Sequence, residues 1–215
     1  MLLISADVVG VRVGQHRAAI TAAESVGVES IVYTSIVNPV PANPAVVVPD
    51  HIATERDLTD SGVGWVILRN SVYADIQARE MANAAATGRL VTNQGNGSAS
   101  YVTRADCARA AASALIADFA TGRVYDITGP DAVNADRRAA IFTSITGAPI
   151  EVVEVDDETY ARGVSETTGI PLEQTRAFAT FGEAVRGGWF EVVSGDFETL
   201  TGSQSQALLQ FLEGV

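Results

Sequence analysis

Short apolar runs alternate with helical stretches through the first 70 residues, and this alternation limits the fold more than any other feature of the sequence. Apolar spacing predicts a helix over 9–23, and a second helix is expected from an N-cap at Asp50 to about Asp60. Strands separated by helices need crossover connections, which give a parallel sheet. The sequence therefore predicts a doubly wound α/β fold. Three runs have the length and composition of buried strands: residues 2–5, 30–35 and 63–68.

The rest of the chain is patterned more loosely and predicts a small α/β cap. The sequence shows no internal repeat and no clear linker, so the parts are expected to pack as one unit: a nucleotide-domain portion over 1–130 and an interleaved cap over 131–215. Strands are expected at 123–128 and 150–155, and helices at 75–86, from about Thr103, and at 135–146, 157–164, 172–185 and 204–212.

The charged residues exclude several classes of function. The net charge of −12 argues against nucleic-acid binding, which depends on clustered Lys and Arg. All 14 basic residues are Arg, and there is no Lys. A Schiff-base lysine, a P-loop lysine and the Tyr-x-x-x-Lys pair of ordinary short-chain dehydrogenases are therefore absent. A GC-rich genome would produce the same bias without any functional meaning.

Membrane insertion and disulfide bonding are not expected. No apolar run is long enough to span a bilayer, and the first apolar run has no basic flank of the kind that a signal peptide carries. The single cysteine, Cys107, excludes an internal disulfide and a cysteine-cluster zinc site. These features predict a cytoplasmic protein.

Polar residues follow the predicted strands. The strand-end residues are Ser5, Thr34-Ser35 and Arg69-Asn70-Ser71, followed by Tyr73, and they stand at the carboxyl ends of three strands. Ligands of open α/β sheets bind at that edge, so the set predicts a ligand crevice with room for a nucleotide. An ordinary turn is an equal alternative for Ser5 taken alone.

Other polar residues allow more than one interpretation. His51 and Glu55 share a helix face at i, i+4, but no third ligand is nearby, so no metal is expected. We expect His51 to be a neutral hydrogen-bond partner or proton donor facing the crevice. His16 is expected to be structural, with Arg17 as an alternative contact for a phosphate. The Gly95-Asn96-Gly97 stretch lacks the pattern of a phosphate loop and is expected to form a mobile turn.

Taken in order, several stretches of the first 150 residues resemble the NmrA-like NAD(P)H:quinone oxidoreductases, an atypical group of short-chain dehydrogenases. No single stretch is specific, whereas the ordered set is. The stretches are Leu2-Leu3-Ile4-Ser5, Gly14-Gln15-His16-Arg17, Tyr33-Thr34-Ser35, His51 with Thr54-Glu55, Leu68-Arg69-Asn70 with Tyr73, Thr103-Arg104-Ala105-Asp106, and Gly122-Arg123-Val124-Tyr125.

The resemblance implies a Rossmann-type domain with a C-terminal cap, and two-electron reduction of a quinone by NADPH, with NAD as an alternative, without a flavin. It assigns Tyr73, Asn70 and His51 to catalysis, and His51 takes a position that is Lys in many relatives. The cofactor contacts that it implies are Ser5, Thr34, Ser35, Asn70, Ser71, Val72 and Tyr73.

The largest departure from the family is that the Gly-rich turn that cradles the pyrophosphate does not occur in the sequence. We therefore expect the chain to be the second part of a longer enzyme. Two alternatives stay open: a dinucleotide-sensing module without turnover, and an inactive fragment that pairs its open sheet edge with another chain, as in a homodimer.

Overall fold

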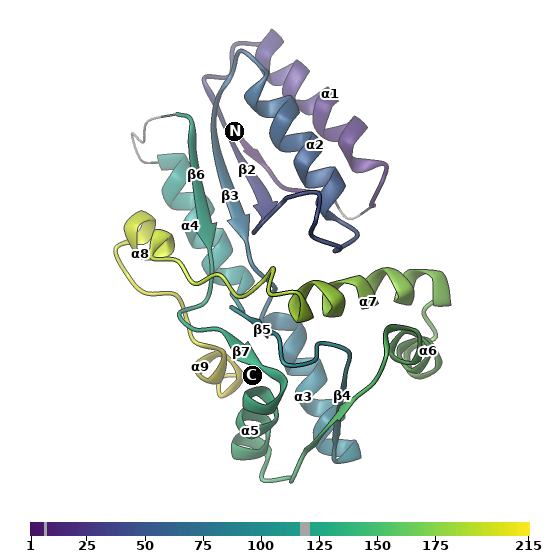
Figure 1. Cartoon of the computed structure of the whole chain (residues 1–215). Coiled ribbons are helices and arrows are strands. Elements are labelled where there is room, and N and C mark those ends of the chain that lie inside the picture. Colours follow the sequence, from purple (N-terminus) through teal and green to yellow (C-terminus); the bar gives the residue numbers. More distant parts are fainter. Residues whose placement is uncertain (7, 117–120) are drawn as a thin grey trace.

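A four-stranded parallel sheet organises the first part of the molecule. The structure is a computed structural model that describes residues 1–6, 8–116 and 121–215. The strands lie in the order β1-β2-β3-β6 (Figure 1). This confirms the α/β prediction of a parallel sheet. The strands are β1 (Leu2–Leu3), β2 (Ser30–Ile36), β3 (Gly64–Asn70) and β6 (Arg123–Ile127), and each neighbouring pair is parallel.

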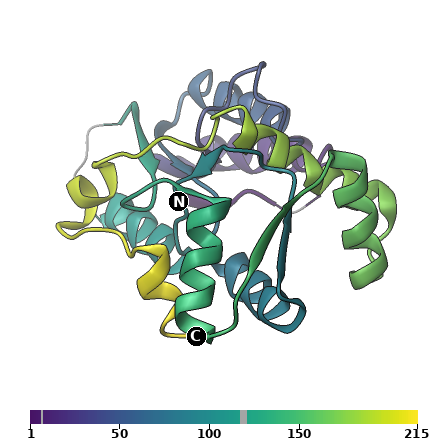
Figure 2. The same cartoon turned by 60° about the horizontal axis from the view of Figure 1, so that its bottom comes forward.

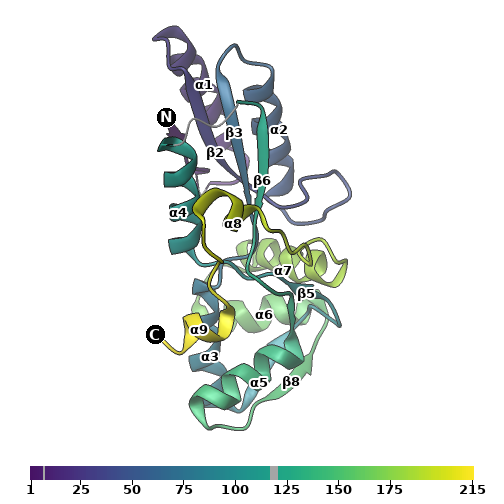
Figure 3. The same ribbon diagram turned by 90° about the vertical axis from the view of Figure 1, so that its left-hand side faces the viewer.

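Helices cover both faces of this sheet. On one face, α1 (Arg12–Ser25) and α2 (Val48–Thr59) bury an apolar cluster that includes Ile31 and Ile67. On the other, α4 (Arg104–Ile116) buries Val32 and Leu68. Figure 3 shows α2 and α4 on opposite sides of the strands. Neighbouring strand residues point to opposite faces, so the continuous apolar runs of β2 and β3 are those of a sheet buried on both sides.

The second part of the molecule is built from short strands and helices around the largest apolar cluster. Strand β4 (Arg89–Thr92) pairs in parallel with β8 (Glu151–Glu154), and β5 (Ser98–Ala99) pairs antiparallel with β7 (Val133–Asn134). In Figure 2, α9 lies beside α5, in agreement with their shared core. The helices of this part are α3 (Asp75–Thr87), α5 (Ala135–Thr146), α6 (Asp157–Thr168), α7 (Leu172–Arg186) and α9 (Leu208–Leu212).

The chain crosses between the two parts several times. β4 and β5 come from the first 130 residues but pair with strands of the later segment. In the reverse direction, α8 (Asp196–Thr201) returns to β6, where Asp196 Oδ2 accepts a 2.8 Å hydrogen bond from the Asp126 amide. The cap is thus interleaved with the sheet, and the boundary near residue 130 stays a prediction.

The start of α2 differs from the expectation. The helix begins at Val48, and Asp50 lies in its first turn with its side chain turned toward α1 rather than capping the helix. Asp50 Oδ2 accepts hydrogen bonds from Gly10 N at 2.8 Å and Arg12 Nε at 3.0 Å. Arg12 is 4% exposed. A buried guanidinium without a counter-ion costs more free energy than a helix start without a side-chain cap, so Asp50 pairs with Arg12.

The Gly-rich loop is packed tightly, in contrast to the mobile turn expected from the sequence. Gly95 N donates to Glu154 Oε1 at 2.9 Å. A Cβ on Gly97 would lie 2.1 Å from the Val185 carbonyl oxygen, so only glycine fits against α7 there. The loop is therefore part of the cap's packing. Among the described residues, no helix has both the length and the apolar character needed to cross a membrane.

Candidate cofactor site at the strand ends

The structure brings the polar residues of three strand ends to one edge of the sheet. β1, β2 and β3 run in parallel, and Ile36 is the register partner of Asn70. Ser5 N donates a 3.0 Å hydrogen bond to Thr34 Oγ1, which ties the end of β1 to β2. Thr34 and Asn70 are both buried. Beyond this edge lie α7 and the segment after it (Figure 1), where Asn38 Nδ2 donates to the Trp189 carbonyl.

The segment after β3 is held by backbone hydrogen bonds and by one hydrogen bond between side chains. Ser71 N donates to the Ile127 carbonyl at 2.9 Å, and Ser71 Oγ accepts from Ser100 Oγ at 3.0 Å. Val102 N donates to the Val72 carbonyl at 3.0 Å, and Tyr73 forms an isolated bridge with Val102. The expected cofactor segment, 70–73, is therefore rigidly placed along the sheet edge.

Asn70 and Tyr73 have the polar atoms that could serve a cofactor. Asn70 Oδ1 is buried and has no hydrogen-bond partner among the described residues. A buried amide oxygen without a donor fits an amide N–H of a bound ligand, such as the carboxamide of nicotinamide. Burial raises the pKa of Tyr73, an effect that the Asn70 amide partly offsets by hydrogen bonding. The phenol therefore keeps its proton at neutral pH.

Ser35 lies next to Thr34 but points to the opposite face of the sheet. Its Oγ donates a 2.6 Å hydrogen bond to Glu55 Oε1 of α2. Glu55 is also bound by Arg69, through Nε at 3.0 Å and Nη2 at 2.7 Å. In the sequence, Glu55 stands out as the i+4 neighbour of His51 and as part of the Thr54-Glu55 stretch, but neither feature predicts its pairing with Arg69.

His51 is placed in the layer between the sheet and α2. Its Nδ1 lies 2.9 Å from Tyr33 Oη, and the residue is 5% exposed. Burial and the nearby Arg12 charge lower the pKa of His51 to about 3, so the ring is neutral. Burial raises the pKa of Tyr33, so its hydroxyl keeps its proton at neutral pH. The structure brings His51 to Tyr33, and its catalytic role stays a prediction.

His16 has the contacts of a structural histidine. Thr54 Oγ1 donates to the Asp50 carbonyl and lies 2.9 Å from His16 Nδ1, and His16 Nε2 accepts from Ala6 N at 3.1 Å. Burial lowers the pKa of His16. The alternative role of Arg17 as a phosphate contact is not supported by its partner, because Arg17 forms a 2.9 Å ion pair with Asp57 at the surface.

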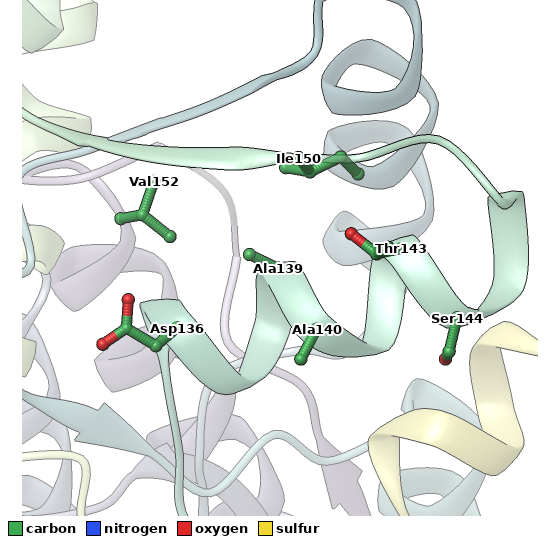
Figure 4. Close-up of a pocket in the computed structure, with 7 residues that line it drawn as sticks. All are labelled: Asp136, Ala139, Ala140, Thr143, Ser144, Ile150 and Val152. Atoms are coloured by element: carbon green, nitrogen blue, oxygen red, sulfur yellow. The ribbon is translucent and has the colours of Figure 1, made fainter.

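A hollow of about 590 Å³ lies away from the strand ends, between α5 and the start of β8. Figure 4 shows that small and aliphatic side chains line most of it, and Asp136 is the one ionisable group among the seven drawn. It offers no arrangement for chemistry. In the described part of the chain, no three His, Cys, Asp or Glu side chains lie where they could share a metal ion.

Several known proteins similar to this chain are NAD(P)H-dependent reductases. Quinone oxidoreductase 2 of Escherichia coli is 33% identical over 193 residues, which are 89% of this chain and 66% of that protein. The crystal structure of this NADPH-dependent enzyme with NADPH has a TM-score of 0.94 at 29% identity, covering 99% of this chain and 75% of that one. The Citrobacter triphenylmethane reductase in complex with NADP(H) has a TM-score of 0.88 at 25% identity and covers 99% and 74%.

A fungal relative carries the family's name. The NmrA-like family domain-containing oxidoreductase of Aspergillus flavus is 25% identical over 197 residues, 90% of this chain and 62% of that protein. No family model matches the sequence. The chain thus spans about two thirds or less of these relatives' sequences. The ordered motifs, the parallel sheet and these similarities agree, and the chain belongs to the NmrA-like, atypical short-chain dehydrogenase family.

Proposed function

We propose that the chain forms the nicotinamide-binding and acceptor-binding part of an NADPH-dependent oxidoreductase that reduces quinones by two electrons without a flavin. The observation that carries this proposal is the unpartnered, buried Oδ1 of Asn70, which lies at the carboxyl edge of a parallel sheet. That edge is where such folds bind nucleotides. Two of the similar structures named above, which hold NADPH and NADP(H), support the proposal, and NAD is the alternative cofactor.

Each residue of the edge has a proposed task. When bound, NADPH supplies the hydride. Asn70 Oδ1 would accept a hydrogen bond from the carboxamide, which fixes the ring's orientation. Thr34 and Ser5 would form the floor on the neighbouring strands, and the backbone at Ser71 and Val72 would run along the ring. Orientation of this kind supplies much of the rate enhancement in a transfer between two bound molecules.

Tyr73 is the residue proposed to polarise or protonate the acceptor. A quinone that accepts hydride develops negative charge on its oxygens, and a phenol within reach can polarise or protonate them. The raised pKa of Tyr73 keeps its proton in place until such charge appears. His51 has a smaller proposed role, since its Nδ1 is already bound to Tyr33.

Quinone reduction by the purified chain tests the proposal. With NADPH and a benzoquinone, we expect NADPH consumption in a one-to-one ratio with quinone, with no flavin added or extracted. NADPH binding without any turnover would instead support a dinucleotide-sensing module. Absence of both would contradict the proposed function.

We also propose that the chain works in the cytoplasm and that two copies pair through the β1 edge of the sheet. The first proposal is supported by the lone buried cysteine, Cys107, whose pKa burial raises to about 12 and which is thus kept unreactive. The second is supported by β1, an edge strand of two residues, and by exposed apolar residues beside it. These residues are Ile4, Val8, Val9 and Val11. Light scattering measures the pairing directly.

A further inference from the structure

A row of polar side chains crosses the sheet just before its carboxyl edge. Ser35 is the register partner of Arg69, and Arg69 is the partner of Asp126, so all three side chains leave the same face of β2, β3 and β6. Glu55 of α2 lies over this row. One of its oxygens accepts from Ser35 Oγ and Arg69 Nε, and the other accepts from Arg69 Nη2.

This contact differs from the surface ion pairs of the same helix. The Glu55 side chain is 12% exposed and that of Arg69 30%, and the guanidinium binds both carboxylate oxygens. Hydrogen bonding to Glu55 raises the pKa of Arg69, and the charge of Asp126 acts in the same direction. Bidentate pairs of this kind are stronger and more directional than single contacts. Arg17 and Asp57 also form a two-oxygen pair, but it lies at the surface with 62% and 23% exposure, so the difference between the two pairs is burial.

The residues bound by Glu55 immediately precede or follow those of the candidate site. Ser35 follows Thr34 in β2, and Arg69 precedes Asn70 in β3. Alternation along a strand turns Thr34 and Asn70 away from α2 while their neighbours face it. The backbone pairing continues past this point, where Val37 N donates to the Asn70 carbonyl at 3.1 Å. A carboxylate on α2 therefore fixes two strand ends at once.

We propose that Glu55 is a positioning residue for the nicotinamide crevice: by binding Ser35 and Arg69 together, it holds Thr34 and Asn70 at the spacing that the nicotinamide needs. The inference rests on the proposed function for its ligand. It also assigns Ser35 to this clamp, so Thr34 supplies the hydroxyl on the crevice side. Loss of the clamp loosens the end of the β2–β3 pair without touching the ligand.

The test compares Glu55→Gln with Asp57→Asn, a matched loss of one carboxylate charge on the same helix, and with the conservative variant Arg69→Lys. Two ligands are titrated into the full chain: reduced nicotinamide mononucleotide, which carries the nicotinamide with its ribose and one phosphate but no adenosine, and 2′,5′-ADP, which lacks the nicotinamide. Native-state hydrogen exchange is followed at the Val37 amide. The Gly64 amide, which donates to the Glu29 carbonyl at the opposite end of the same strand pair, is the internal reference.

We expect Glu55→Gln to weaken binding of reduced nicotinamide mononucleotide about tenfold, with 2′,5′-ADP unchanged. The Val37 amide should exchange about tenfold faster and the Gly64 amide at its original rate. Arg69→Lys, which keeps the charge, should show a smaller loss than Glu55→Gln, and Asp57→Asn should stay within about twofold of the parent. These readouts separate positioning from general stability, which would affect both amides.

If Glu55→Gln changes neither the affinity for reduced nicotinamide mononucleotide nor the exchange rate of the Val37 amide, the inference is overturned. Equal acceleration at Val37 and Gly64 would also overturn it, because Glu55 would then act only on global stability. If the parent chain binds no reduced nicotinamide mononucleotide, the proposed function is contradicted. Exchange at Val37 alone then decides whether Glu55 orders the strand ends.

Discussion

The Tyr73 ring lies under the guanidinium of Arg104, with 5.0 Å between the guanidinium carbon and the ring centre. This contact holds the phenol beside the start of α4, just after the end of β3, where the proposed acceptor would lie. Tyr73→Phe keeps the ring and removes the hydroxyl. We expect turnover of quinone to fall about tenfold, or about 1.4 kcal/mol of barrier, with little change in unfolding temperature.

Tyr160→Phe, on α6 in the cap, is the matched control for loss of one phenol, because burial also raises the pKa of Tyr160, to about 12. It should leave turnover unchanged. Steady-state kinetics measure both variants, and equal losses in the two would remove Tyr73 from the reaction.

Substitutions of Asn70 and His51 test whether catalysis depends on the strand-end residues or on His51 as the proton donor. Asn70→Ala removes the unpartnered Oδ1 and should lower turnover about tenfold, whereas His51→Ala should lower it less because the histidine binds Tyr33. Steady-state quinone reduction measures both variants. Full activity in Asn70→Ala with a collapse in His51→Ala would make His51 the proton donor.

His51 makes stability depend on pH. Its pKa is about 3 in the folded chain against 6.5 for the unperturbed group, so below pH 6.5 the unfolded state binds a proton that the folded state rejects. Stability is therefore highest above pH 6.5 and falls toward pH 3, with a slope of at most about 1.4 kcal/mol per pH unit from this group. Urea unfolding between pH 7 and 4 should show a shallower decline in His51→Gln. An identical decline in both proteins would contradict the buried neutral state.

The buried pair of Arg12 and Asp50 should matter far more for stability than an exposed pair. Asp50→Ala leaves a 4% exposed arginine without its counter-ion and should cost about 3–5 kcal/mol of unfolding free energy. Asp57→Ala breaks the surface pair with Arg17 and should cost about 1 kcal/mol or less. Denaturant titration measures the loss of unfolding free energy in each variant. Equal losses in the two variants would contradict the expectation and would mean that water replaces the Asp50 carboxylate beside Arg12.

Two glycines test the packing of the cap. Gly97→Ala would place its Cβ 2.1 Å from the Val185 carbonyl oxygen and should destabilise by about 1–3 kcal/mol. Gly163, inside α6, faces open space: apart from its own helix backbone, no atom lies within 4 Å of the place that a Cβ would take. Gly163→Ala should therefore stabilise by about 0.5–1 kcal/mol. Thermal unfolding shifts of the same sign in both would contradict the packing of the loop on α7.

The sequence predicted the sheet well because β2 and β3 are seven-residue runs flanked by helices with clear ends. It missed β4, β5 and β7, because strands of four and two residues are too short to show a clear alternating pattern. The strand-end set followed from a general rule of α/β folds. The pairs Glu55–Arg69 and Arg12–Asp50 could not be predicted, because they depend on how α2 is rotated over the sheet and against α1.

The central claim is that the strand ends bind the nicotinamide end of NADPH, and saturation-transfer NMR of NADPH with the purified chain tests it most directly. We expect transfer mainly to the nicotinamide protons, lost in Asn70→Ala, with a dissociation constant weaker than about micromolar, since the sequence has no Gly-rich turn for the pyrophosphate. Transfer confined to the adenine protons, or nicotinamide transfer that persists in Asn70→Ala, would contradict the claim.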